Sequence, residues 1–276
     1  MNDTHDIRPG QSIELLKELH ILTRDGRMNQ DSRRKLKQIY HLHQFIEPLL
    51  QELLLTHADI QLVDHGAGKS YLGFILYDLF FKALNQGCHV YGIETRDELV
   101  TNSRDLAKHL NFPGMSFLNL SVADSMTAPG LPTRVDMVTA LHACDTATDD
   151  AIRFALGKKV PFIVLVPCCQ AEVAAELRKN KGKILASSAL AELWRHPLHT
   201  REFGSHMTNV LRCLQLEAYG YQVTVTELVG WEHSLKNELI IARDQNLPGR
   251  RAGERLQELL RMLGLEEMRM RFFAPG

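Results

Sequence analysis

Short apolar runs alternate with longer segments of helical periodicity through the middle of the chain. The runs expected to form strands are Ile60–Asp64, Val90–Glu94, Ser116–Leu120, Val135–Ala143 and Phe162–Val166. The segments expected to form helices between them are Ser70–Leu84, Asp97–Leu110 and the stretch after Thr148. Short strands that alternate with helices are typical of a parallel sheet with both faces covered. The pattern therefore predicts an α/β protein with a doubly wound sheet.

The segment before the first strand is predicted to be helical. Apolar residues recur at intervals of three and four over residues 13–55. Asp31 or Ser32 is a suitable N-cap, and Pro48 is expected to begin a fresh helix at its first turn. We expect these helices to cover one edge of the sheet.

The alternation stops after the fifth strand. Residues 170–220 are predicted to form a mostly helical insertion. Because ligands of such sheets bind beyond the strand C-termini, we expect it to overhang the site as a substrate lid.

Tyr221–Val229 and Glu238–Ala242 are expected to be two final antiparallel strands, before a linker and a helix over Glu254–Leu263. The predicted domains are an N-terminal helical extension (1–57), the sheet domain with its insertion (58–245) and a C-terminal helical tail (246–276).

The composition is that of an ordinary globular protein. The 276 residues are 45% hydrophobic and 24% charged, with a formal net charge of -1. No apolar run approaches a membrane span and the first residues lack a signal-peptide pattern, so we expect a cytoplasmic protein with no membrane partner. The five cysteines do not form a disulfide framework, and reduced thiols are expected. The sequence does not indicate the oligomeric state.

A glycine motif at the end of the first strand is the strongest chemical signal. Asp64-x-Gly66-x-Gly68 follows the apolar run, and Glu94 ends the second strand. Glycines let a ligand approach the backbone, and an acid after the second strand receives ribose hydroxyls. Val63 stands where a Walker A loop needs its first glycine, and Tyr71 stands where a nicotinamide-type motif needs its third. Both of those interpretations therefore fail on spacing.

The acid directly before the glycines suits a cationic ligand. A carboxylate there attracts the ammonium and sulfonium end of S-adenosylmethionine and repels a phosphate. We therefore predict S-adenosylmethionine as the cofactor. The alternative is a generic tight turn between a strand and a helix, because a lone glycine pair is a weak signal.

Three clusters of basic residues are candidate RNA contacts. They are Arg33, Arg34, Lys35 and Lys37; Arg178, Lys179, Lys181 and Lys183; and Arg250 with Arg251. Because the net charge is close to zero, RNA binding would have to come from such local clusters. The alternative for each cluster is a solvated helix face.

Three further motifs resemble those of a family of methyltransferases. They read LHACDTATD over Leu141–Asp149, VPCCQ over Val166–Gln170 and EHSLKN over Glu232–Asn237, and Lys35-x-x-Gln38-Ile39 upstream is also similar. The family includes the methyltransferase half of the glutathione S-transferase C-terminal-domain-containing protein and proteins labelled rRNA adenine dimethylase-domain-containing. The resemblance covers about residues 25–243. It implies a Rossmann-like class I methyltransferase fold of seven strands, the last inserted antiparallel.

The resemblance assigns five residues to the cofactor. They are Asp64, Gly66 and Gly68 at the methionine end, Glu94 at the ribose hydroxyls and Asp124 at the adenine amino group. An alternative for Asp124 is a helix cap, a common role of Asp at a strand-to-helix junction. Ser70 stands where many methyltransferases have a third glycine, and its small side chain is expected to do little harm.

Candidate catalytic residues follow the fourth and fifth strands, which are neighbours in a doubly wound sheet. They are His142, Cys144 and Cys168, with Cys169 beside them. One interpretation is a zinc site, which the adjacent cysteines disfavour. Another is a thiol nucleophile of the kind that cytosine-5 methyltransferases carry after these strands. The base case is a pocket in which His142 positions the acceptor or takes its proton, with no metal.

Together these features predict a cytoplasmic S-adenosylmethionine-dependent methyltransferase whose acceptor is RNA. The Asn/Asp-Pro-Pro-aromatic motif of many amino-group methyltransferases is absent after the fourth strand, which weakens an adenine target. The alternatives are a protein or small-molecule acceptor, or a non-catalytic binding module with a cofactor-type fold. The retained Asp64, Gly66, Gly68 and Glu94 argue against the last.

Overall fold

The computed structural model describes most of the chain. The residues described are 7–84, 87–141, 146–167, 170–179, 189–228, 238–247 and 249–273. Two compact units are present, the first formed by Met1–Thr139 with Glu227–Asn237 and the second by Ala140–Thr226 with Glu238–Gly276.

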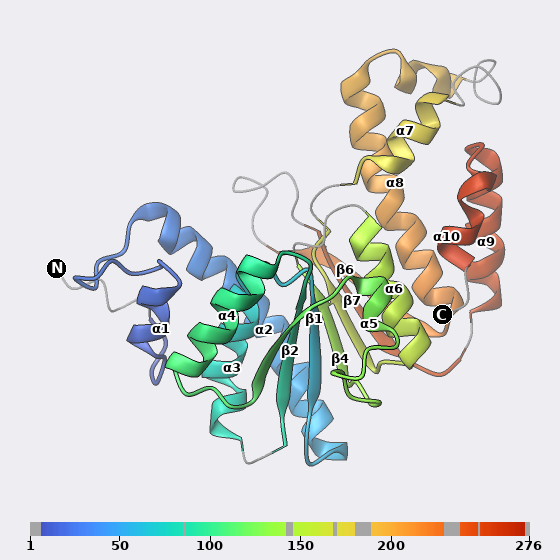
Figure 1. Cartoon of the computed structure of the whole chain (residues 1–276). Coiled ribbons are helices and arrows are strands. Elements are labelled where there is room, and N and C mark those ends of the chain that lie inside the picture. The colour runs from blue at the N-terminus through green and yellow to red at the C-terminus, as the bar shows by residue number, and fades with distance from the viewer. Residues whose placement is uncertain are drawn as a thin grey trace. The chain divides into compact units, whose positions relative to one another are not determined.

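The strands form one seven-stranded mixed sheet (Figure 1). They are β1 (Gln61–His65), β2 (His89–Glu94), β3 (Met115–Asn119), β4 (Met137–Ala140), β5 (Phe162–Leu165), β6 (Tyr221–Glu227) and β7 (Glu238–Asp244). Their order is β3-β2-β1-β4-β5-β7-β6. The pairs β1–β2, β2–β3 and β1–β4 are parallel, and β5–β7 is antiparallel. The predicted Rossmann-like α/β fold, with its last strand inserted antiparallel, is confirmed.

The apolar runs become strands because they are buried on both faces. All four residues of β4 are buried, as are all four of β5. A strand without a solvent-facing side has no need of alternating polar residues. This burial explains why the two strands appear in the sequence as continuous apolar runs.

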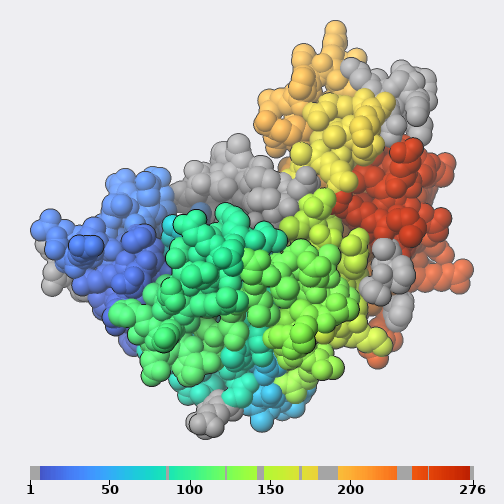
Figure 2. Space-filling view, viewed as in Figure 1, coloured from blue at the N-terminus to red at the C-terminus, as the bar shows by residue number. Residues whose placement is uncertain are grey.

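Helices of the first unit cover its strands. They are α1 (Ile13–Glu18), α2 (Gln30–Thr56), α3 (Tyr71–Leu79), η2 (Phe81–Ala83), α4 (Asp97–His109) and α5 (Val122–Ser125). The helix α3 packs on β2 and on α2, and α4 packs on β2 and β3. Figure 2 shows the blue surface of the N-terminal helices beside the green surface of α4. These helices are linked by a contact of 3.0 Å between the His109 ring and a Glu14 carboxylate oxygen.

Two predictions for α2 were wrong. Asn29 is the N-cap instead of Asp31 or Ser32, and its side-chain oxygen accepts a hydrogen bond of 2.7 Å from the Ser32 N–H. Pro48 begins no new helix and lies inside one continuous helix. A proline inside a helix removes one backbone hydrogen bond. The buried Ile46, Leu49, Leu50 and Leu53 around it supply packing that offsets this loss.

The second unit contains the remaining helices. They are α6 (Thr146–Lys158), α7 (Glu172–Lys179), η3 (Ala189–Trp194), α8 (Pro197–Ala218), α9 (Arg250–Met262), η4 (Glu266–Met268) and α10 (Arg269–Phe273). The helix α9 begins at Arg250, so much of the stretch expected to be a linker is helical. The stretch 170–220 is mostly helical as predicted, and its role as a lid stays a prediction.

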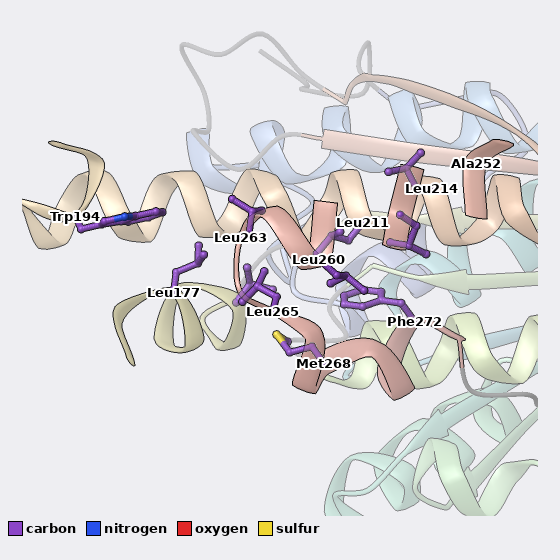
Figure 3. Packing of buried hydrophobic residues seen from close by; sticks show 12 residues of the cluster. Leu177, Trp194, Leu211, Leu214, Ala252, Leu260, Leu263, Leu265, Met268 and Phe272 are labelled. Atoms are coloured by element: carbon purple, nitrogen blue, oxygen red, sulfur yellow. The ribbon is translucent and has the colours of Figure 1, made fainter. Parts of the chain in front are cut away.

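One apolar cluster joins α7, η3, α8, α9, η4 and α10 (Figure 3). Leu211 and Leu214 of α8 meet residues of α7, α9 and the chain end. The other buried members are Val173, Leu177, Trp194, Ala252, Leu256, Leu260, Leu263, Leu265, Met268 and Phe272. The C-terminal helices are therefore part of the core of the second unit. Within the described ranges, no helix combines the length and the apolar character of a membrane span.

Candidate functional site

The loop after β1 has the backbone shape that its glycines predict. Gly66 and Gly68 have φ angles of 64° and 59°, in the left-handed region that favours glycine. The Ala67 N–H donates to the Ile93 carbonyl oxygen at 3.0 Å, which fastens the loop to β2. The loop therefore presents its backbone at the carboxyl ends of two adjacent parallel strands, where ligands of such sheets bind.

Ser70 fits its position because a second glycine makes room for it. The Ser70 backbone also lies in the left-handed region, with φ 51°, and its side chain is buried. A Cβ atom on Gly73 would lie only 2.5 Å from the Ser70 Oγ atom. The expectation that Ser70 does little harm thus depends on Gly73, which was not singled out from the sequence.

Glu94 is held by hydrogen bonds on both of its carboxylate oxygens. Its Oε1 atom accepts from the backbone N–H and the Nε of Arg96, each at 3.0 Å. Its Oε2 atom accepts from the Gly68 N–H at 2.9 Å and from Arg96 Nη2 at 3.1 Å. Burial alone would raise the pKa of Glu94, but the Arg96 contacts and the Gly68 hydrogen bond together lower it to about 2. Glu94 is therefore ionised, and it links the glycine loop to the end of β2.

Asp64 is buried beneath the same loop. Thr139, its register partner on β4, donates its hydroxyl to Asp64 Oδ1 at 2.6 Å. Burial raises the pKa of Asp64 to about 7, although the Thr139 hydrogen bond lowers it. Burial also lowers the pKa of the neighbouring His65 to about 3. A carboxyl group with a pKa near neutrality gains stability as an anion when a cation binds beside it.

Asp124 is exposed in the first turn of the four-residue helix α5. Ser121 is the N-cap, and its hydroxyl accepts from the Asp124 N–H at 3.0 Å and donates to Asp124 Oδ2 at 2.5 Å. Asp124 is thus a partner of the capping residue and does not occupy the cap position. Its predicted contact with an adenine amino group stays a prediction.

Three cationic side chains surround the glycine loop, and only one of them lies in the motif. Lys69 is exposed within the loop. Lys35 of α2 places its Nζ atom 3.2 Å from the ring centroid of Tyr71, the first residue of α3. Arg96 Nη2 would lie 3.8 Å from a Cβ atom on Gly68, so the guanidinium covers this glycine. The sequence placed Lys35 in a basic cluster, but only the fold brings it to the loop.

A pocket of about 420 Å³ opens beside the loop in the first unit. Lys69 and Tyr71 line it together with α4 residues, and its polar lining also includes His20, Asn102, Asp105 and His109. This pocket lies on the α4 side of the loop and mixes both charge signs with apolar surface. It is large enough for part of a polar ligand.

The predicted catalytic residues lie outside the described part of the chain. These are His142, Cys144 and Cys168, with Cys169, and their roles stay predictions. Among the residues that the structure describes, no group of three His, Cys, Asp or Glu side chains is arranged to hold a metal ion.

A network of buried polar side chains in the second unit includes residues close in sequence to these candidate catalytic positions. Asn209 of α8 accepts from Gln170 Nε2 at 2.6 Å and donates to Glu238 Oε2 at 2.6 Å. The adjacent Arg212 donates to Asn209 Oδ1 at 3.3 Å and forms an ion pair with Asp149. Asp149, Gln170 and Glu238 end or follow the three motifs noted in the sequence. The role of α8 in joining them was not predicted.

The residues of the first unit fit S-adenosylmethionine. Gly66 and Gly68 carry no side chain that would keep a ligand from the loop backbone, and the ionised Glu94 is an acceptor for hydroxyl groups. The Asp64 carboxyl, with its pKa of about 7, suits a cationic group. The fit has one condition, because Arg96 already contacts both Glu94 oxygens.

Comparisons with known proteins agree with this geometry. A family model described as a methyltransferase domain matches residues 34–176. No curated protein sequence is significantly similar to the chain.

Several solved structures are similar in fold. Magnesium protoporphyrin IX methyltransferase from Synechocystis PCC 6803, with bound SAH, is 14% identical over 83% of this chain and 94% of that chain, with a TM-score of 0.43. An rRNA methylase from Streptococcus thermophilus is 7% identical over 68% of this chain and 87% of that chain, with a TM-score of 0.41. TrmK from M. capricolum, in complex with SAH, is 10% identical over 73% of this chain and 69% of that chain, with a TM-score of 0.41. These values are too low to support any conclusion about the acceptor.

Proposed function

This chain belongs to the methyltransferase-domain family, and on that premise we propose that it transfers the methyl group of S-adenosylmethionine to RNA. The enzyme class and the cofactor follow from the family. The acceptor is the open question. The observation that supports RNA is the concentration of cationic side chains around the glycine loop.

The residues of the first unit have distinct tasks in this reaction. When bound, the cofactor supplies an electrophilic methyl group carried on a sulfonium. Glu94 receives the ribose hydroxyls, and the loop at Gly66 and Gly68 accommodates the methionine end. Asp64 lies behind that loop and gains charge when a cation approaches, because its pKa of about 7 leaves much of it protonated beforehand. These contacts hold and orient the methyl donor for the transfer.

The charge around the loop favours an acceptor that is a polyanion. Lys69, Lys35 and Arg96 come from three separate segments and all lie at the loop. The whole chain has a net charge of only -1, so attraction of a polyanion has to come from local groups such as these. Phosphates of a bound RNA would contact these side chains and bring a nucleotide to the methyl donor. A neutral small-molecule acceptor would gain nothing from them.

The experiment that tests the acceptor offers three fractions to the enzyme. The purified protein is incubated with S-adenosylmethionine labelled on its methyl group and, separately, with total RNA, total protein and small metabolites. We expect the label in RNA. Label in protein or in a small molecule would refute the RNA proposal and leave the methyltransferase class intact. S-adenosylhomocysteine binding without any transfer in the three fractions would favour the non-catalytic module.

Binding measurements test the basic residues themselves. Replacing Lys35 and Lys69 together by Ala should weaken binding of single-stranded RNA at low salt. It should also reduce the salt slope by about 0.7 for each phosphate that the variant no longer neutralises. The matched control is Arg195→Ala with Arg201→Ala, which removes the same charge from exposed positions of the second unit outside the three basic clusters. An equal loss of affinity in both double variants would show that only overall charge matters.

A further inference from the structure

We propose that Arg96 competes with the cofactor ribose for Glu94, so that an anion which draws Arg96 away makes the cofactor bind more tightly. The inference rests on the proposed function for the position of the ribose. The rest follows from the contacts of Glu94 and from where Arg96 lies in the chain.

Glu94 has no acceptor capacity left for a ligand in this arrangement. Arg96 makes two parallel side-chain contacts with its oxygens, at 3.0 and 3.1 Å. The backbone N–H groups of Arg96 and Gly68 take two further positions, and the Thr95 hydroxyl makes a longer contact with Oε1 at 3.4 Å. A carboxylate accepts about four hydrogen bonds in all. Two ribose hydroxyls can therefore reach Glu94 only if the Arg96 side chain leaves. The two backbone contacts can remain and keep the carboxylate in place.

The Arg96 side chain can move away from Glu94 because it is mostly exposed to solvent. The side chain is 66% exposed, whereas that of Glu94 is 8% exposed. The guanidinium lies over Gly68, in front of the loop that receives the ligand. An exposed arginine regains its hydration when it swings out, and the ribose hydroxyls then replace its hydrogen bonds to the buried Glu94 carboxylate, which offsets the loss of the ion pair. The carboxylate itself stays buried and preorganised.

The position of Arg96 is also unfavourable for an arginine. Arg96 is the N-cap residue of α4, and its side chain caps no backbone group. Ser, Thr, Asp and Asn are preferred there, and a positive charge near a helix N-terminus opposes the helix dipole. Asp97 and Glu98 in the first turn partly offset this charge. A residue that is wrong for its local structure is expected where it serves a site.

The coupling to an anion follows from thermodynamic linkage. A phosphate that binds the outward conformation of Arg96 removes the competitor of the ribose, and the ribose in turn releases Arg96 to the phosphate. The two ligands must strengthen each other by the same factor. An RNA acceptor would thus bind best to the enzyme that already holds its methyl donor.

The first experiment measures S-adenosylhomocysteine binding by calorimetry. We expect Arg96→Ala to tighten binding by about three- to fivefold, the worth of a partly exposed ion pair. S-adenosylhomocysteine lacks the sulfonium charge that Arg96 could repel. Arg96→Lys keeps the positive charge at this position but loses the two-pronged contact with Glu94. Tighter binding in both variants therefore excludes simple charge repulsion. In a Glu94→Gln background, Arg96→Ala should give no gain. Unchanged or weaker binding in Arg96→Ala would overturn the proposal.

The second experiment measures the coupling. Single-stranded polyuridylate should bind the wild-type protein about three- to fivefold more tightly when S-adenosylhomocysteine is present, and equally in both conditions for Arg96→Ala. The control is Arg134→Ala, which removes an exposed arginine paired with Asp59 and Asp136 in the same unit, and it should keep the coupling. Equal RNA affinity with and without S-adenosylhomocysteine in the wild type would overturn the coupling. RNA that fails to bind at all would refute the RNA acceptor, while the calorimetric result would still decide the competition.

Discussion

Arg212 and Asp149 form a buried, two-pronged ion pair in the second unit. Arg212 Nε lies 2.7 Å from Asp149 Oδ1, and Nη2 lies 2.9 Å from Oδ2. Arg212 is fully buried and Asp149 is 3% exposed. Arg271 of α10 contacts the same carboxylate at its edge. A single carboxylate on α6 thus receives two arginines, from α8 and from the chain end.

We expect Asp149→Asn to be the most damaging single change in this network. It removes the two-pronged ionic contact of the buried Arg212 side chain, which costs about 3–5 kcal/mol. Arg212→Met should cost less, because Asp149 keeps Arg271. The free energy of unfolding in urea measures both. Arg250→Met, which breaks an exposed pair with Glu254, is the control and should change it by no more than about 0.5 kcal/mol. Similar values for all three variants would contradict the prediction.

Two glycines on neighbouring helices should respond in opposite directions to the same substitution. A Cβ atom on Gly204 of α8 would lie 2.6–2.8 Å from the Cβ, Cα and N atoms of Ala174 on α7. A Cβ atom on Gly253 of α9 would meet only the Ala218 Cβ, at 3.7 Å. Gly204→Ala should therefore destabilise by about 1–3 kcal/mol, and Gly253→Ala should stabilise by about 0.5–1 kcal/mol. Thermal unfolding of the two variants checks this, and a common sign would refute it.

Asp64 and His65 should make opposite contributions to the pH dependence of stability. The pKa of Asp64 rises from 3.8 to about 7 on folding, so the folded state holds the extra proton and stability falls as pH rises through that window. The pKa of His65 falls from 6.5 to about 3, so its contribution rises with pH over that range. The two pH ranges overlap between 3.8 and 6.5. There the two opposite slopes of stability against pH, each about 1.4 kcal/mol per pH unit, cancel.

Removing either group should expose the slope of the other. Relative to the wild type, Asp64→Asn should gain stability as pH rises from 3.8 to about 7, and His65→Gln should lose stability as pH rises from about 3 to 6.5. Urea unfolding at several pH values measures the difference in the free energy of unfolding between each variant and the wild type. The contributions of all other titrating groups cancel in this difference. Curves parallel to that of the wild type would show that neither shift exists.

Cofactor affinity should depend on pH through Asp64. Its ionised form attracts the ammonium and sulfonium groups, so S-adenosylmethionine should bind about three- to tenfold more tightly as pH rises through the pKa of about 7. Asp64→Asn should bind more weakly and with little pH dependence. Calorimetry across this range is the measurement. A wild-type affinity that is flat in pH would place the cationic end of the cofactor elsewhere.

The cysteines and His142 can be separated by chemistry, although they lie outside the described ranges. We expect His142→Ala to reduce turnover more than Cys168→Ala or Cys169→Ala, with no stoichiometric zinc and no covalent adduct. RNA containing 5-fluorocytidine and mass spectrometry provide the test. An adduct trapped on Cys144 or Cys168 would establish a thiol nucleophile. Zinc that copurifies near one equivalent would establish a metal site.

The strands were predictable from the sequence because burial leaves a local signature. The Val90–Glu94 run lies within β2, and Phe162–Val166 contains β5, since both are apolar runs that end at turns. The left-handed backbone of the glycine loop was likewise predictable, because that geometry requires glycine at fixed spacings, and Glu94 ends β2 as expected. The α2 cap was missed, because Asn29, Asp31 and Ser32 all suit an N-cap in isolation.

The contacts between distant residues were not predictable. Arg212 and Asp149 are 63 positions apart, and nothing in the local sequence distinguishes this arginine from an exposed one. Lys35 was grouped with its helical neighbours, whereas the fold brings it to Tyr71. Arg96, two residues after Glu94, resembled an ordinary surface residue before a helix. Pairing of this kind depends on tertiary packing, which periodicity and spacing do not encode.

The central place of α8 in the second unit has a consequence during synthesis. Its apolar face packs on α7, which precedes it, and on α9 and Phe272, which come last. A growing chain cannot complete this core until residues 250–273 have left the ribosome. At about 5–20 residues per second, α8 then waits for several seconds with Leu211 and Leu214 uncovered. The nascent second unit is therefore a natural client for chaperones at the ribosome, whereas the parallel strands β1 to β3 can pair well before translation ends.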